Sequence, residues 1–376
     1  MRRSLLLVAA VLCAVPSFAA PQGGNVLGHA VTEGQSTAAY WTSERLASAK
    51  PFDLAPMISA DAAEVTADAT VDESFAGEVI GEPGAPPSRR GVPSLRRQIV
   101  DPSALASFMN ETGEAIEGEN VGTQAAHFTS SRLIPLSADT TYPYATVGRL
   151  FFSDGPTNYV CSASVLRQRI ILTAGHCVHK GSGGQSGFYS NFLFVPAYRD
   201  GAAPFGTWAA VYIYVTNTWA TGNAVFPNSQ DFATIEVDDK NGLKIGKSYT
   251  GFLGYIINKL HPNHATLVGY PVNLDNGTKM HQVTAGSKGP YGSNTNTVIY
   301  GADMRGGASG GPWIQNFGAV ATGQTAGTNK LLNAVIGVTS YGPVATTSLF
   351  LGSSIPDNRF VQLINAACAR RAGNCS

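Results

Sequence analysis

Two short motifs, far apart in this 376-residue chain, constrain its fold most strongly. The first is Leu172-Thr-Ala-Gly-His-Cys177, and the second is Arg305-Gly-Gly-Ala-Ser-Gly-Gly-Pro-Trp313. A serine hydroxyl is a weak nucleophile at its ordinary pKa, so it needs an imidazole to accept its proton and a third group to orient that imidazole. His176 and Ser309 are the candidates for the first two groups.

The third group is expected between the two motifs. Asp231 directly precedes a short apolar run that ends at Val237, and its carboxylate could face the imidazole from there. Asp238 and Asp239 follow the run and would lie at its far end, whereas Asp200 lies in a loop bounded by Gly and Pro. We therefore expect Asp231 to orient His176.

The order of these residues along the chain discriminates between folds that use the same chemistry. Residues 307–311 match the G-x-S-x-G pattern of the α/β-hydrolases, but that fold places its histidine after the serine. The last histidine of this chain is His281, which precedes Ser309. The order His176, Asp231, Ser309 excludes the α/β-hydrolase fold.

The two motifs, their order and their cysteines resemble the chymotrypsin-like serine proteases over about residues 128–376. Within that class the chain is most similar to the secreted microbial branch that includes trypsin-like and V8-like (glutamyl) endopeptidases. The resemblance implies an all-β fold of two packed antiparallel β-barrels, with the three residues in the cleft between them. It also implies an endopeptidase that hydrolyses peptide bonds through an acyl-enzyme on Ser309.

The glycines before Ser309 suit an oxyanion hole, which must stabilise the negative oxygen of a tetrahedral intermediate. Gly306 and Gly307 permit a backbone turn that aims the N–H groups of Gly307 and Ser309 at one point. We expect these two N–H groups to be the donors.

The run from Ile336 to Gly342 resembles the strand that pairs with the substrate backbone in this family. Ser340, Tyr341 and Gly342 would then add the substrate as an extra antiparallel strand, with Tyr341 as an aromatic flank. Thr339 stands where glutamate-selective members carry a histidine, which counts against glutamate specificity.

Asp303 falls where trypsin-like members carry the aspartate at the base of the primary specificity pocket. A carboxylate there would select Arg or Lys through charge-assisted pairing. Met304 and Arg305 replace the usual small residue and cysteine, and Arg305 could neutralise Asp303. Basic side chains and small or aliphatic side chains both remain candidate substrates.

The cysteines indicate an oxidising compartment. Cys13 lies within residues 1–20, which are predicted below to be a signal peptide that is removed. Four cysteines remain, and they allow three pairings. The family resemblance implies a Cys161–Cys177 bridge beside the histidine, and Cys368 and Cys375 would then close a small C-terminal loop. The spacings between the four cysteines match no known zinc-binding pattern. We therefore expect neither a metal site nor a cofactor.

The chain divides into three parts. Residues 1–20 are a predicted secretory signal, with Arg2 and Arg3 before a short apolar run, so the protein is expected to be secreted, into the periplasm or outside the cell. Residues 21–127 are expected to be a largely irregular propeptide with 15 acidic and 6 basic residues. Residues 128–376, the expected protease domain, carry 10 acidic and 17 basic residues.

The propeptide is the expected intramolecular partner of this domain. Animal-type family members carry an aspartate directly before the catalytic serine, and on activation this aspartate pairs with the freed N-terminal ammonium group. In this chain Ala308 occupies that position, and an alanine cannot form the ion pair. Activation should therefore remove a steric or electrostatic cover, which suits an acidic leader facing a basic domain. The exposed pairs Arg89-Arg90 and Arg96-Arg97 are candidate processing sites.

After residue 128 the chain consists of short apolar runs broken by Gly, Asn and Pro, as expected for barrels. The predicted strands are residues 145–152, 159–165, 170–173, 211–216, 265–270, 297–300, 334–340 and 348–351. One amphipathic helix is predicted at residues 357–367, because Phe360, Leu363, Ile364 and Ala367 recur at helical spacing.

Other partners are not indicated. The sequence has no cluster of basic and aromatic residues of the kind that binds nucleic acid. It also has no apolar segment long enough to indicate a membrane-spanning helix. We expect a monomer that acts on proteins or peptides. The competing hypothesis is a catalytically inactive protein of the same fold that serves in binding or adhesion.

Overall fold

The structure, a computed structural model, describes residues 25–31, 34–52, 55–56, 80–88, 97–101, 103–104, 127–291, 294–319, 330–343 and 349–376. The predicted signal peptide and the residues Arg89, Arg90 and Arg96 lie outside the described residues. Among the described residues, no helix has the length and apolar character needed to cross a membrane.

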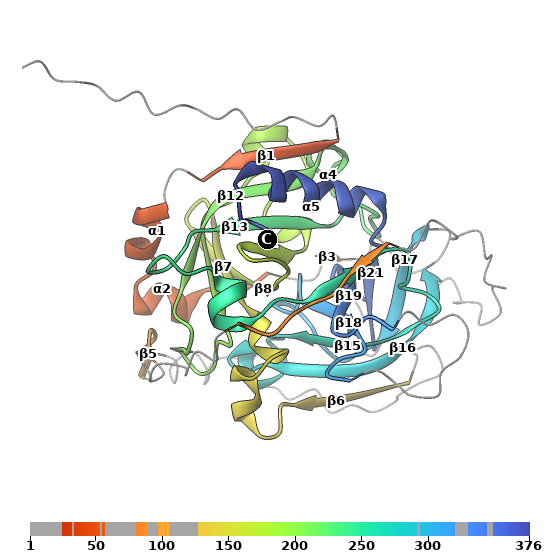
Figure 1. The fold of residues 1–376 in the computed structure, drawn as a ribbon, viewed down its shortest axis with the longest axis horizontal. Coiled ribbons are helices and arrows are strands. Elements are labelled where there is room, and N and C mark those ends of the chain that lie inside the picture. Colours follow the sequence, from red (N-terminus) through yellow and green to blue (C-terminus); the bar gives the residue numbers. More distant parts are fainter. Residues whose placement is uncertain are drawn as a thin grey trace, which may run out of the picture.

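The first half of the domain is a closed barrel (Figure 1). Its strands follow the order β12-β10-β7-β8-β9-β13, and antiparallel pairing of β12 with β13 closes it. The interior is apolar, with Leu150, Ile171, Ile213 and Ile235 almost completely buried. The strands are β7 (Val147–Asp154), β8 (Thr157–Val165), β9 (Ile170–Thr173), β10 (Ser190–Pro196), β12 (Trp208–Thr216) and β13 (Ala233–Val237).

The second half is a sheet with its own core, in which Leu267, Trp313 and Ile336 are fully buried. β6 adds to this sheet beside β16. The strands are β6 (Phe128–Arg132), β14 (Gly254–Ile256), β15 (His264–Gly269), β16 (His281–Tyr291), β17 (Asn294–Gly301), β18 (Pro312–Gln315), β19 (Ala334–Val338), β20 (Tyr341–Gly342) and β21 (Phe350–Ser354). A closed barrel beside a second sheet confirms the predicted all-β class.

The predicted C-terminal helix is confirmed as α5 (Asn358–Arg370). Asp357 caps it, because its side chain accepts a hydrogen bond from the N–H of Arg359. The four predicted apolar residues are buried where α5 packs on β12 and β13 (Figure 1). Its last turn is tied by the Cys368–Cys375 disulfide.

The described parts of residues 21–127, the predicted propeptide and here called the leader, are more regular than their composition indicates. They form β1 (Val26–Ala30), α1 (Gly34–Tyr40), α2 (Ser43–Ser48), β2 (Lys50–Pro51), β3 (Ala55–Pro56), β4 (Gly81–Glu82) and β5 (Arg97–Gln98). β1 pairs antiparallel with β12, β4 with β14, and β5 with the short strand β11 (Ala202–Ala203). Pairing with strands of the domain satisfies backbone groups that the leader alone would leave to water.

Candidate active site

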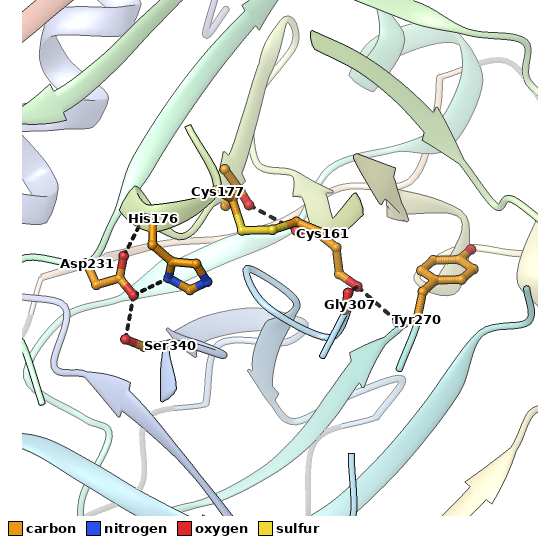
Figure 2. The surroundings of a disulfide bond; sticks show 9 residues. Cys161, His176, Cys177, Asp231, Tyr270, Gly307 and Ser340 are labelled. Atoms are coloured by element: carbon orange, nitrogen blue, oxygen red, sulfur yellow. Dashed lines mark hydrogen bonds and ion pairs between the residues drawn. A yellow bond between two sulfur atoms is a disulfide. The ribbon is translucent and has the colours of Figure 1, made fainter. Parts of the chain in front are cut away.

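His176 lies on a short 3-10 turn, Gly175–Cys177, that directly follows β9. The Cys161–Cys177 disulfide joins this turn to β8, with the two Cα atoms 6.2 Å apart. Figure 2 shows the disulfide beside the imidazole. Both predicted disulfides are present, and the first of them holds the turn that carries His176.

Asp231 contacts His176 through two hydrogen bonds. The Nδ1 atom of His176 lies 2.7 Å from Oδ2 of Asp231, and the backbone N–H of His176 donates to Oδ1 at 2.8 Å. The Asp231 side chain is completely buried, just before β13 as the sequence predicts. The two contacts fix both the position and the ring orientation of the imidazole.

Ser340 is a third member of this cluster. Its hydroxyl donates to Oδ2 of Asp231 at 2.5 Å, so the carboxylate lies between the imidazole and this hydroxyl (Figure 2). From the sequence, Ser340 is predicted only as part of the substrate-binding strand. No local signal reveals the contact, because 109 residues separate Ser340 from Asp231.

We expect Ser340→Ala to lower kcat by about tenfold while leaving KM nearly unchanged, because the change removes one charge-assisted hydrogen bond to Asp231. The measurement is steady-state hydrolysis of a peptide substrate across a range of pH. Ser186→Ala, which removes an exposed loop hydroxyl, is the matched control. An unchanged kcat for Ser340→Ala would show that Asp231 needs no further support.

Ser309 lies on the turn before β18, and backbone contacts hold it in place. Its carbonyl accepts from the N–H of Ser162 at 2.7 Å, and the N–H of the next residue, Gly310, donates to Thr339 at 2.7 Å. Within the described parts of the chain, the Ser309 hydroxyl and Nε2 of His176 are buried atoms with no hydrogen-bond partner. The Ser309 hydroxyl and Nε2 of His176 are therefore not hydrogen-bonded to each other in this structure.

The glycines around Ser309 are required by the backbone. Gly307 has a φ of +85°, and a Cβ atom there would lie 2.7 Å from the carbonyl oxygen of Tyr270. Gly310 has a φ of +77°, and its Cβ would lie 2.0 Å from Oγ1 of Thr173. Only glycine fits these positions without strain. The N–H of Gly307 points at an acceptor, the carbonyl oxygen of Phe52 in the leader, at 3.1 Å.

Asp303 is partly exposed, and its carbonyl accepts from Nδ2 of Asn273 at 2.8 Å. Its Oδ1 atom is buried and has no partner among the described residues. Burial lowers the pKa of Arg305, while the nearby charge of Asp303 opposes that shift. The charge of Asp303 therefore favours the charged form of the Arg305 guanidinium.

The residues of the expected substrate-binding strand are buried. Thr339 accepts from Nε1 of Trp313 at 3.0 Å. The Tyr341 hydroxyl lies 3.1 Å from Oγ1 of Thr297, and its ring covers Gly352, where a Cβ would meet ring atoms at 2.0 Å. The backbone of Tyr341 and Gly342 pairs with the leader strand β3. The Tyr341 ring is therefore completely buried and packs against Gly352 of β21.

One group of potential metal ligands lies at this site. Ligand atoms of Cys161, His176 and Cys177 lie within 4.8 Å of one another. The two sulfur atoms are joined in the disulfide, so neither can act as a thiolate ligand. This donor set does not suit a zinc ion.

The disulfide beside His176 should matter for both stability and activity. We expect Cys161→Ala/Cys177→Ala to lower the free energy of unfolding by about 3 kcal/mol, because a cross-link over this length of chain restricts the unfolded state. Denaturant unfolding measures the loss. Cys368→Ala/Cys375→Ala is the comparison: it should lose stability but keep kcat. Equal kcat in the two variants would contradict a role for the first bridge in holding His176.

Comparisons with known proteins agree with this geometry. No family model matches the chain. The chain is 28% identical over 175 residues to the glutamyl endopeptidase of Bacillus licheniformis and 24% identical over 196 residues to an extracellular metalloprotease of Bacillus subtilis. The first match covers 46% of this chain and 49% of the endopeptidase, and the second covers 51% of this chain and 57% of the metalloprotease. The chain therefore spans about half the length of the curated relatives it matches.

A solved structure matches this chain over nearly all of its own length, in contrast to the two curated relatives. The thermostable serine protease AL20 from an extremophilic microorganism aligns with a TM-score of 0.51 and 27% identity, over 60% of this chain and 98% of that one. The chain therefore has a chymotrypsin-like fold. Its resemblance to chymotrypsin-like serine proteases, with a V8-like relative among its matches, is confirmed.

Proposed function

We propose that the protein is a secreted serine endopeptidase, with Ser309 as nucleophile, His176 as general base and Asp231 as the residue that orients the imidazole. The observation that carries the proposal is the buried hydrogen-bonded cluster of His176, Asp231 and Ser340. A buried carboxylate bonded to Nδ1 leaves Nε2 as the atom that can accept a proton.

The reaction follows from these positions. Ser309 attacks the substrate carbonyl carbon while Nε2 of His176 accepts the hydroxyl proton, and His176 then gives that proton to the leaving amine. A water molecule then attacks the resulting acyl-enzyme: His176 accepts a proton from the water and returns it to Ser309, which releases the acid product. The N–H groups of Gly307 and Ser309 stabilise the negative oxygen of each tetrahedral intermediate. That the N–H of Gly307 donates to a peptide carbonyl supports this role.

The substrate is proposed to be an extended peptide that pairs with Ser340, Tyr341 and Gly342. Asp303 favours a basic side chain before the cleaved bond, whereas coupling to Arg305 favours a small or aliphatic one. A relative is named glutamyl endopeptidase, but Thr339 is engaged by Trp313 and supplies no imidazole for a carboxylate.

The organisation of the chain completes the proposal. Residues 1–20 direct secretion, residues 21–127 form an inhibitory propeptide, and residues 128–376 form a monomeric protease domain without a cofactor. The two disulfides and the extracellular relative support secretion.

The alternative is an inactive protein of the same fold that binds or adheres to a partner. It predicts a surface for that partner but no hydrolysis. Digestion of a mixed peptide library by the processed protein separates the two. We expect cleavage that Ser309→Ala removes; the absence of any cleavage by the wild-type protein would favour the alternative.

A further inference from the structure

The leader residue Phe52 lies directly beside the proposed catalytic residues. Its N–H donates to the carbonyl of Val160 at 2.9 Å, and its own carbonyl accepts from the N–H of Gly307 at 3.1 Å. Its ring stacks on the imidazole of His176, with 5.8 Å between ring centroids and 21° between the planes. One leader residue therefore contacts both the proposed base and a proposed oxyanion donor.

An aromatic pocket holds the Phe52 ring. The ring centroid lies 5.4 Å from that of Phe152, 5.1 Å from Tyr159 and 5.9 Å from Tyr189. These separations are in the range of favourable aromatic pairs. Phe52 is thus an anchor for the leader in the cleft, with a carbonyl at the oxyanion donor and a ring in an apolar pocket.

The described leader strands on either side of Phe52 run in the direction opposite to that expected for a substrate. Before Phe52, β2 runs parallel to β8, with Pro51 opposite Val160. After it, β3 runs parallel to β20, with Ala55 opposite Tyr341. A substrate is expected to pair antiparallel with β20. The leader is therefore reversed relative to a substrate, with its N-terminal side along β8 and its C-terminal side along β20.

We propose that the leader inhibits the enzyme as a reversed strand, in which the Phe52 carbonyl occupies the oxyanion hole and the Phe52 ring covers His176. This rests on the proposed function and specifies its regulation. The reversed strand turns its N-terminal side toward β8, where a substrate would carry its leaving amine. His176 then has no leaving amine to protonate on that side, and the leader blocks the site without being cut there.

This device differs from the electrostatic cover that the charge of the leader suggests. An ion pair between Glu82 and Arg167 does join the leader to the domain. At the cleft, however, the contacts are backbone hydrogen bonds and packed rings, which salt screens little. Inhibition should therefore change by less than about threefold between 0.1 M and 1 M salt, although the Debye length falls from about 10 Å to 3 Å.

The test is fluorophosphonate labelling of the uncut chain, followed on a gel that separates uncut from processed protein. Phe52→Ala should raise the labelling rate of the uncut band at least about tenfold over wild type, because it removes the aromatic anchor. The control is Tyr40→Ala. Tyr40 is a leader aromatic that bonds to Asn158, and the structure gives it no contact with His176. Its uncut band should label as slowly as wild type.

Two further readouts do not depend on labelling. The amide of Gly307 should exchange slowly with deuterium in uncut wild type and faster in Phe52→Ala. Mass spectrometry of aged wild-type protein should find no new N-terminus at Asp53, because a reversed strand is not a substrate there. Cleavage before Asp53 would contradict the reversed direction.

The outcomes also separate this inference from the proposed function. Rapid labelling of uncut wild type, together with labelling of processed protein, would overturn the inference and leave the protease assignment standing. An unlabelled Phe52→Ala uncut band with a labelled processed band would do the same. If neither form of any variant labels, both proposals fail.

Discussion

Ser309→Ala should lower kcat for peptide hydrolysis by about 10⁶, the loss expected when the nucleophile of a serine triad is removed. The fold should survive, because the substitution removes one hydroxyl that has no hydrogen-bond partner among the described residues. Backbone hydrogen bonds of Ser309 and Gly310 hold the turn, and they do not involve the Ser309 side chain. The measurement is hydrolysis of a peptide substrate by processed enzyme with its leader removed.

The control for this experiment is Ser137→Ala, which removes an exposed hydroxyl far from His176 in sequence. It should leave kcat unchanged. The unfolding midpoint of Ser309→Ala should match that of wild type. Activity of Ser309→Ala within tenfold of wild type would mean that another residue is the nucleophile.

Asp231→Asn should lower kcat by about 10⁴, the effect of this change in a related triad. An amide at this position keeps the size of the side chain but can donate to Nδ1 of His176, which favours the wrong imidazole tautomer. It also leaves the hydroxyl of Ser340 bonded to a neutral acceptor instead of a carboxylate. KM should change little, because Asp231 is completely buried and does not touch the substrate.

The matched control is Asp238→Asn at the other end of β13. Its carboxylate is exposed and pairs with Arg371 at 2.7 Å. Loss of an exposed pair costs little, so kcat should remain near wild type. If Asp231→Asn kept more than a tenth of wild-type kcat, the buried carboxylate would not be what orients His176.

Local chemistry made much of the fold predictable. Residues 170–173 and the amphipathic helix after Asp357 follow from apolar spacing and a capping residue. The sequence does not predict β16 (His281–Tyr291), because Gly286, Lys288 and Pro290 give it no clear alternation. Its hydrogen bonds come from β6, β15 and β17, so its conformation is set by its neighbours rather than by its own residues.

The cluster of His176 and Asp231 was predictable because the order of the motifs along the chain restricts the fold. Ser340 and Phe52 were not predictable as parts of it. Their contacts depend on which strands lie side by side in space, and strands as short as β2, β3 and β20 leave no periodic pattern in the sequence. The leader is also rich in Ala, Gly, Pro and acidic residues, and its apolar residues show no sustained period, which indicates irregular structure when it is considered without the surface it pairs with.

The most direct test of the account is to treat the processed wild-type enzyme with a fluorophosphonate and to locate the adduct by peptide mass spectrometry. A fluorophosphonate modifies a serine whose proton is accepted by a neighbouring base, and it leaves an ordinary serine unmodified. We expect one adduct per chain, on Ser309, and none in Ser309→Ala. An unmodified Ser309 in processed, folded protein, or an adduct on a different serine, would contradict it.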